Sequence, residues 1–324
     1  MAIPHRSRRL PWLLLLAGAA LAAASFVPLD PGFTVATSPP TPTMNLDAFS
    51  AARPTQPLRL LFIHHSIGGQ LLAERGPERE RASCILESHP NGGGLRARLQ
   101  AEGYEVHEAS YGSEIGDRTD LLDWKPKFST RMDKVLRVDE NDRALAEDRS
   151  IDVVMFKSCF PNSHFVANGE APGNASGPEL TVWNAKAALS SLLPELAKRP
   201  KTLFVYVTAP PAAPAGAGPA LKVLAKRLLG RIPSKEAALE QGRLARAFNA
   251  WVVSPEGWLR GYPSRNVVVY DLYDALTDHG KSNHLMYPSG DGSDSHPTSE
   301  GNARASEALP AFLNRAVRRA GLSD

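Results

Sequence analysis

The chain has 324 residues, 43% of them hydrophobic, and its 37 basic side chains nearly balance 34 acidic ones. The resulting formal net charge of +3 gives no electrostatic case for nucleic acid as a partner. The length is sufficient for one large domain with a filled core. The sequence has no internal repeat and no G-x-x-x-x-G-K-[ST] phosphate loop, so it gives no sign of a repeat protein or a P-loop nucleotide-binding enzyme.

The first 30 residues have the layout of an export signal. Three arginines precede an uncharged run over residues 10–29, and the alanines at 22–24 offer a small-residue cleavage site. A run of about 20 apolar residues is also long enough to be an uncleaved anchor that tethers the chain to a membrane. Either way we expect the folded part to be periplasmic or secreted. In that setting Cys84 and Cys159 form a disulfide or remain two buried thiols, and both alternatives stay open.

After this segment, proline and threonine are frequent over residues 31–56, which predicts an extended linker before a domain at 57–324. Within the domain, short apolar runs rich in β-branched and aromatic residues alternate with helical patterns. This alternation predicts an α/β fold with a parallel sheet covered on both faces. The five predicted strands are Leu58–Ile63, Tyr104–Glu108, Ile151–Phe156, Thr202–Val207 and Asn266–Asp271.

Helical spacing of apolar residues marks the segments between and after these strands. A helix is also expected to begin just after Ser66, and Pro310 should kink the last helix. The other predicted helices cover residues 92–103, 180–200, 235–253 and 299–321.

Residues 209–234 interrupt this alternation. A Pro/Ala/Gly-rich stretch precedes a short basic helix with Leu221, Leu224 and Leu228 on one side. This insertion is either a mobile cap over the site or a surface excursion with a solvated basic face.

Polar residues near the ends of the predicted strands indicate the chemistry. Ser66 follows the first strand and precedes two glycines, at the edge of the sheet where α/β proteins bind ligands. A serine hydroxyl needs a base to become a nucleophile, and His296 is the candidate, with Asp294 to orient it and Asp291 as the fallback acid. The structural alternatives are an N-cap role for Ser66 and a helix-capping aspartate beside an incidental histidine.

Four segments together resemble the SGNH hydrolase family, which includes the GDSL esterases and lipases. They are HHSIGG (64–69), ASYGSEIGDRTDLL (109–122), FKSCFPNS (156–163) and DSHPTSEG (294–301). The resemblance spans about residues 57–320, and HHSxG, KSCFPNS and DSHP are most similar to a group of bacterial SGNH-like proteins. It implies a flavodoxin-like three-layer sandwich with about five parallel strands and a reaction without a cofactor. It also implies a Ser66, His296 and Asp294 triad, with Ser66, Gly116 and Asn162 binding the oxyanion.

The sequence departs from the family pattern in three places. The usual Gly-Asp-Ser is His64-His65-Ser66, the usual Gly-x-Asn-Asp is replaced around Asn162, and only Ser295 separates the late Asp and His. An Asp-x-His spacing also occurs in SGNH-like polysaccharide O-acetyltransferases. The function predicted is an exported serine esterase that acts on a carboxylic, O-acetyl ester of a small molecule or carbohydrate. The alternatives are an O-acyltransferase to a sugar and a non-catalytic sugar-binding or scaffold domain.

His64 and His65 are adjacent on the first strand or just beyond it, so their side chains should point to opposite faces. One is expected to line the site and the other to be buried against a helix. A metal site would recruit one of them with Asp294 and His296, but the sequence has no i, i+4 histidine pair and no His-x-Glu signature. We therefore predict no metal ion.

Overall fold

The computed structural model describes residues 45–75, 91–229 and 233–324, all within the unit Pro40–Asp324. The predicted signal over residues 1–30 and Cys84 lie outside the described residues. Within these ranges, no helix combines the length and the apolar character that crossing a membrane requires.

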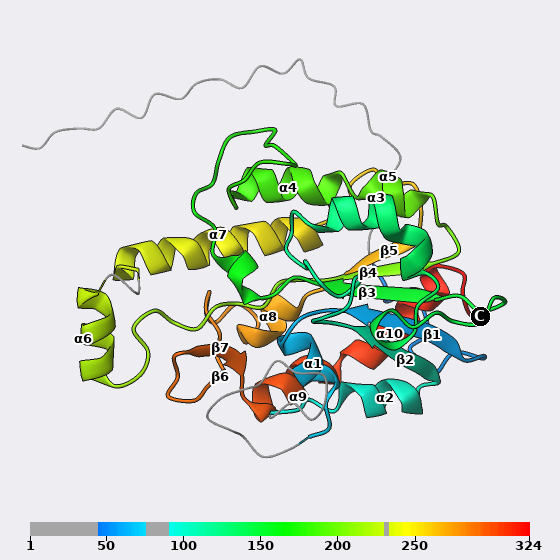
Figure 1. Ribbon diagram of the computed structural model, residues 1–324, viewed down its shortest axis with the longest axis horizontal. Helices are drawn as coiled ribbons and strands as arrows, with labels where there is room; N and C mark the ends of the chain where they lie inside the picture. The colour runs from blue at the N-terminus through cyan, green and yellow to red at the C-terminus, as the bar shows by residue number, and fades with distance from the viewer. Residues whose placement is uncertain (1–44, 76–90, 230–232) are drawn as a thin grey trace, which may run out of the picture. The chain divides into compact units, whose positions relative to one another are not determined.

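Five parallel strands form the central sheet, in the order β2-β1-β3-β4-β5 (Figure 1). This is the strand order of flavodoxin-like proteins, so the predicted α/β fold is confirmed. All five predicted strands are present, with ends within two residues of the expected ones. Their continuous apolar sequences reflect burial on both faces of the sheet. The strands are β1 (Leu58–Ile63), β2 (Tyr104–Ala109), β3 (Val153–Lys157), β4 (Leu203–Val207) and β5 (Val267–Tyr270).

Helices cover both faces of the sheet (Figure 1). Alternate strand residues separate the core into two clusters, since Leu61 and Ile63 pack on one side and Leu60 and Phe62 on the other. One face carries α3 (Trp124–Val135), α4 (Val182–Ser190), α5 (Leu193–Ala197) and α7 (Lys235–Val253). The other carries α1 (Ile67–Leu72), α2 (Leu95–Ala101), α8 (Leu272–Leu276), α9 (Ser299–Glu307) and α10 (Leu309–Arg319).

Prolines divide two of the predicted helices. The helix expected over 180–200 is interrupted between α4 and α5, where Pro194 occupies the first turn of α5. The last helix breaks at Ala308, two residues before Pro310, which agrees with the predicted kink. In both cases proline suits a helix start, because it has no backbone N–H to donate to the preceding turn.

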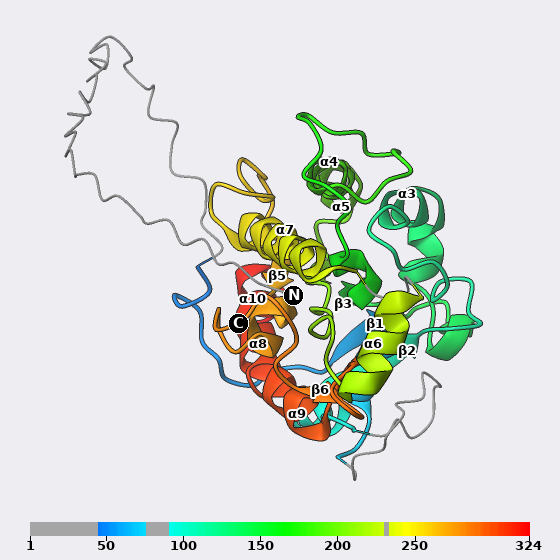
Figure 2. The ribbon, with the colours of Figure 1, turned by 90° about the vertical axis from the view of Figure 1, so that its left-hand side faces the viewer.

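The remaining elements lie along the carboxyl edge of the sheet or outside the layers. The helix α6 stands apart from both layers (Figures 1 and 2). Its Leu221, Leu224 and Leu228 are exposed rather than packed on the core. These elements are α6 (Ala220–Leu228), the antiparallel pair β6 (Pro288–Ser289) and β7 (Asp294–Pro297), and the 3-10 helices η1 (Glu140–Asp142) and η2 (Phe160–Ser163).

Candidate active site

Ser66 occupies the sharp turn between β1 and α1. Its backbone has φ 27° and ψ −88°, a conformation that L-residues rarely adopt. Ser66 is the N-cap residue of α1 by position, but its side chain makes no capping hydrogen bond to the helix. Instead its Oγ lies 2.9 Å from the Sγ of Cys159. The turn therefore directs the hydroxyl toward the residues that follow β3.

Cys159 precedes η2 at the carboxyl end of β3. It is a free, buried thiol, and either its S–H or the hydroxyl of Ser66 can donate in the contact between them. Of the two alternatives for the cysteines, the buried thiol is the one found for Cys159. Sequence reasoning had given this residue no part in the site, although it lies within the FKSCFPNS segment.

Asp294 and His296 form a close pair on β7. The Asp294 Oδ1 is 2.7 Å from His296 Nδ1 and also accepts the backbone N–H of His296 at 3.0 Å. Burial alone would raise the pKa of the Asp294 carboxyl, but the hydrogen bonds from the His296 ring and backbone outweigh it and hold that pKa below its usual value. A carboxylate at Nδ1 favours the tautomer in which Nδ1 carries the proton and Nε2 is the basic nitrogen.

The fallback acid Asp291 has other partners. Its carboxylate is 2.6 Å from the Nζ of Lys222 on α6 and accepts a hydrogen bond from the hydroxyl of Ser293. These hydrogen bonds keep the pKa of Asp291 well below its usual range. The structure thus places Asp294 next to His296, whereas Asp291 is paired with Lys222 of the insertion.

Asn162 lies in η2, three residues after Cys159, and is 3% exposed. Its Oδ1 accepts the backbone N–H of Leu121 at 2.8 Å, and its Nδ2 donates to Asp120 Oδ1 at 2.6 Å. These two bonds fix which way the amide points. The amide nitrogen of Asn162 has two hydrogens, and the bond to Asp120 uses one of them. The other hydrogen can be donated to a ligand.

Gly116 lies in the loop after β2, and this loop is held firmly. The backbone N–H of Gly116 donates to Ser113 Oγ at 2.6 Å. Lys127 on α3 donates to the carbonyl oxygens of Ile115 and Asp117 on either side. A Cβ at Gly116 would lie 2.0 Å from the Ser110 carbonyl oxygen, so only glycine fits. In this structure the N–H of Gly116 bonds Ser113. Its role in binding the oxyanion stays a prediction.

His65 links the Gly116 loop to the strand that carries Ser66. Its Nε2 lies 2.8 Å from the carbonyl oxygen of Gly116, and its ring stacks on Tyr111 with centroids 3.9 Å apart. Burial lowers the pKa of His65 to about 4. The ring is therefore neutral at neutral pH, with its proton on the nitrogen that faces the carbonyl.

His64 points to the opposite side and is 1% exposed. A Cβ on Gly68 of α1 would lie 2.3 Å from the Cβ of His64, which shows how closely the two approach. His64 is thus buried against a helix, as predicted for one of the two histidines, and His65 contacts the Gly116 loop. Among the residues that the structure describes, no three His, Cys, Asp or Glu side chains are grouped in a way that could hold a metal ion.

The turn Cys159–Phe160 connects the two halves of the candidate site. Cys159 contacts the hydroxyl of Ser66, and the ring of the next residue, Phe160, packs edge-on against His296 with centroids 5.5 Å apart. The serine and the Asp294–His296 pair therefore lie around the same short turn, although 228 residues separate Ser66 from Asp294 in the sequence. Nucleophilic catalysis on an ester requires a hydroxyl within reach of a carboxylate-oriented imidazole, and each of these two groups contacts this turn.

No family model matches the chain, and no curated protein matches it in sequence. Among solved structures, the chain is similar to one variant of Axe2, an acetyl xylan esterase from Geobacillus stearothermophilus, at 13% identity and a TM-score of 0.39. That likeness covers 85% of this chain and 98% of the other. A catalytic mutant of the same esterase is similar at 15% identity and a TM-score of 0.34, over 82% of this chain and 95% of the other. These likenesses are distant.

Proposed function

We propose that this chain is an exported serine esterase that hydrolyses a carboxylic, O-acetyl ester of a carbohydrate. One observation carries the proposal: the Asp294–His296 pair, joined at 2.7 Å, packs through Phe160 on the turn whose Cys159 contacts the hydroxyl of Ser66. The uncharged run over residues 10–29 supports export, to the periplasm or beyond, with a membrane tether if the run is not cleaved.

In the proposed reaction, the Oγ of Ser66 attacks the ester carbonyl while Nε2 of His296 takes the hydroxyl proton. Asp294 holds the imidazole in place and offsets its charge. The tetrahedral intermediate collapses to an acyl-enzyme, and the alcohol leaves with the proton from His296. Water then attacks the acyl group and gives a proton to His296. The second tetrahedral intermediate collapses, Ser66 Oγ takes the proton back from His296 as it leaves, and the carboxylic acid is released.

Three groups are proposed to stabilise the oxyanion: the N–H groups of Ser66 and Gly116 and the amide of Asn162. The amide of Asn162 is buried and oriented by Asp120 and Leu121, which favours a preorganised donor. For Gly116 to donate, its N–H must turn from Ser113 Oγ toward the substrate or share the hydrogen between the two. Removal of one such donor typically lowers kcat by about 10²–10³-fold.

The test combines turnover with covalent labelling. The purified full chain is incubated with 4-nitrophenyl acetate, and separately with a fluorophosphonate whose adduct is located by peptide mass spectrometry. We expect an adduct on Ser66 that is lost in His296→Ala, and no turnover by Ser66→Ala. Ser306→Ala serves as the matched control, because Ser306 is a fully buried serine of α9 whose hydroxyl bonds the carbonyl of Asn302.

A folded chain that forms no adduct and turns over no ester would contradict the proposal and favour a non-catalytic binding domain. An adduct on Ser66 combined with transfer of the acetyl group to an added sugar, in preference to water, would redirect the proposal to an acyltransferase.

A further inference from the structure

A pocket of about 380 Å³ lies beside the candidate site, on the other side of β7. Successive side chains of a strand point to opposite faces, so Ser295 faces away from its neighbours Asp294 and His296. Its Oγ lines the pocket and accepts the backbone N–H of Ala213 at 3.0 Å. The pocket and the Asp294–His296 pair therefore share one strand as a wall.

Phe160 joins the pocket to the catalytic side. Its ring centroid is 6.2 Å from that of His164, which lines the pocket, and 5.5 Å from that of His296. Ser163, next to Asn162, also lines the pocket. The pocket therefore borders the turn that carries Asn162 and the strand that carries His296. Its volume of about 380 Å³ lies in the range of about 300–1,000 Å³ typical of small-molecule sites.

The pocket is lined by neutral polar groups and small side chains. No Lys, Arg, Asp or Glu is among the described residues that line it, which gives a phosphate or carboxylate no charged partner. Partial burial lowers the pKa of His164 and of His284, so both rings are neutral near pH 7. These neutral donors and acceptors can bond hydroxyl groups, and the alanine, proline and valine side chains between them are apolar. The polar side chains that line the pocket are Ser163, His164, Gln241, Asn283, His284, Ser293 and Ser295.

The wall that carries His284 is built around a glycine of α7. A Cβ at Gly242 would lie 2.9 Å from His284 Cε1 and 3.1 Å from Asn283 Cβ. Glycine inside a helix costs about 1 kcal/mol relative to alanine, so a packing reason for it is expected. The close approach of the His284 ring supplies that reason.

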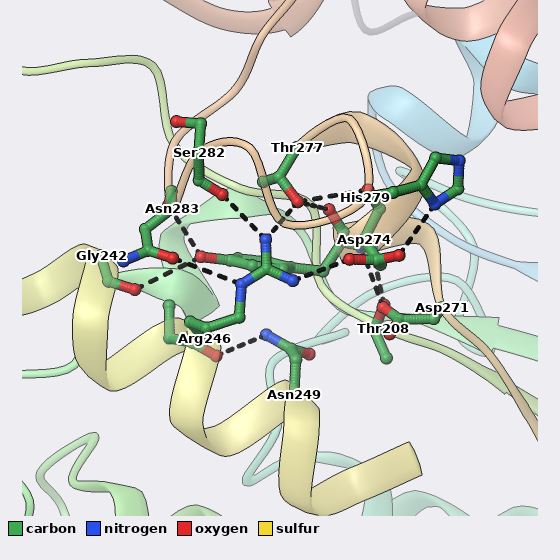
Figure 3. A network of polar contacts seen from close by, with 12 residues as sticks. Thr208, Gly242, Arg246, Asn249, Asp271, Asp274, Thr277, His279, Ser282 and Asn283 are labelled. Atoms are coloured by element: carbon green, nitrogen blue, oxygen red, sulfur yellow. Dashed lines mark hydrogen bonds and ion pairs between the residues drawn. The ribbon is translucent and has the colours of Figure 1, made fainter.

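Arg246, one turn further along α7, fixes the same wall (Figure 3). Its guanidinium bonds the carbonyl oxygen of Ser282 at 2.8 Å and the Oδ1 of Asn283 at 3.3 Å, and pairs with Asp274 at 2.8 Å. The hydroxyl of Tyr273 also donates to the carbonyl oxygen of Asn283, at 2.7 Å. The segment that presents Asn283 and His284 is therefore held in one position.

The insertion supplies the facing wall, and three hydrogen bonds hold its first part. Ser163 Oγ donates to the carbonyl oxygen of Pro210 at 2.8 Å, and the backbone N–H of Leu285 donates to that of Ala212 at 2.8 Å. The bond between Ala213 and Ser295 is the third. This part of the insertion is thus hydrogen-bonded to the segments that carry Asn162 and His296.

We infer that this pocket binds the uncharged, hydroxyl-rich alcohol part of the substrate, one sugar unit of the ester that Ser66 attacks. The inference rests on the proposed function and adds where the sugar is held and by which residues. Gln241 and His284, on α7 and the facing loop, are the side chains that hydrogen-bond its hydroxyls.

The test compares two substrates in the full chain. A mono-O-acetylated methyl pyranoside has a sugar as its alcohol, whereas 4-nitrophenyl acetate has none. We expect the double variant Gln241→Ala/His284→Ala to raise KM for the pyranoside by about 10–100-fold, since each lost hydrogen bond contributes about 1 kcal/mol or somewhat more. Any loss of kcat/KM on 4-nitrophenyl acetate should be at least tenfold smaller than the loss on the pyranoside, because its alcohol part has no hydroxyl group to bond in the pocket. Gln100→Ala, on the exposed face of α2, is the control for truncation of a glutamine.

Equal losses on both substrates, or no loss on the pyranoside, would overturn the inference. Calorimetric titration of the pyranoside into Ser66→Ala tests sugar binding in the pocket separately from the proposed esterase activity. If the pyranoside binds Ser66→Ala but not the triple variant Ser66→Ala/Gln241→Ala/His284→Ala, the pocket is supported even if the parent chain proves to be no esterase. No binding in a chain that hydrolyses 4-nitrophenyl acetate overturns the pocket and leaves the esterase standing.

Discussion

Replacement of Ser66 by glycine and by alanine separates its chemistry from its backbone strain. Both variants lose the hydroxyl and its contact with Cys159, so neither should turn over an ester. They differ because alanine keeps a Cβ at φ 27°, ψ −88°, whereas glycine has no Cβ and tolerates positive φ more readily. A sparsely populated conformation of this kind costs about 1–3 kcal/mol for a residue with a side chain.

Other terms also distinguish glycine from alanine. Glycine gains more entropy on unfolding, by about 0.5–1 kcal/mol, and at a buried site it loses about 0.8 kcal/mol of methyl burial. Ser306 supplies the same two terms without the strain, because it is fully buried in the regular helix α9. The change from alanine to glycine should therefore be more favourable at Ser66 than at Ser306 by the strain alone, about 1–3 kcal/mol.

Urea unfolding of the four single variants measures this difference, from midpoints analysed with a common m-value. We expect glycine to be clearly worse than alanine at Ser306, and at Ser66 to be either less disadvantaged or better than alanine. If glycine destabilises both sites by the same amount relative to alanine, the turn at Ser66 stores no strain. The conclusion that a strained turn directs the Ser66 hydroxyl toward Cys159 would then have to be abandoned.

Two further predictions concern the candidate acids, Asp294 and Asp291, and Lys127, which bonds the loop around Gly116. Asp294→Asn should lower kcat on 4-nitrophenyl acetate by up to about 10⁴-fold, because the amide favours the wrong tautomer of His296. Asp291→Asn should leave kcat nearly unchanged in the same steady-state assay. A larger loss in Asp291→Asn than in Asp294→Asn would assign the role of the acid to Asp291. Lys127 has its pKa lowered to about 8 by burial, so the unfolded chain binds more protons than the folded one between about pH 8 and 10.5. The free energy of unfolding of the parent chain, measured relative to that of Lys127→Met, should accordingly rise with pH through this window, and a flat difference would mean that Lys127 is not desolvated.

The position of the site follows from the connectivity of the sheet. β1 and β3 are neighbours, so the loops that carry Ser66 and Cys159 leave the same edge side by side. β2 lies on the other side of β1, which brings the Gly116 loop within reach of His65. In a parallel sheet all these loops emerge at the carboxyl ends of the strands, where ligand sites of this fold class form.

Much of the scaffold could be read from local sequence. Buried parallel strands are continuous apolar runs, and all five were predicted because their hydrophobicity does not depend on partners. The Asp294–His296 pair was also accessible, since two residues of spacing on an extended segment place both side chains on one face. The helix α3 was missed because its sequence, WKPKFSTRMDKV, mixes polar and apolar residues around Pro126 and gives a weak helical pattern.

Long-range contacts decided the rest of the site. Nothing local to Cys159 indicates that its thiol meets a hydroxyl 93 residues earlier, and nothing local to Lys127 indicates that it bonds the carbonyls around Gly116. The pocket beside β7 likewise depends on Gly242, His284 and Ser295, which come from separate elements. The sequence by itself determined the strands, the layers and the residue types at the strand ends, because burial and periodicity are local properties. Only the tertiary structure decided which of those residues meet, since hydrogen bonds between distant segments depend on how the whole chain packs.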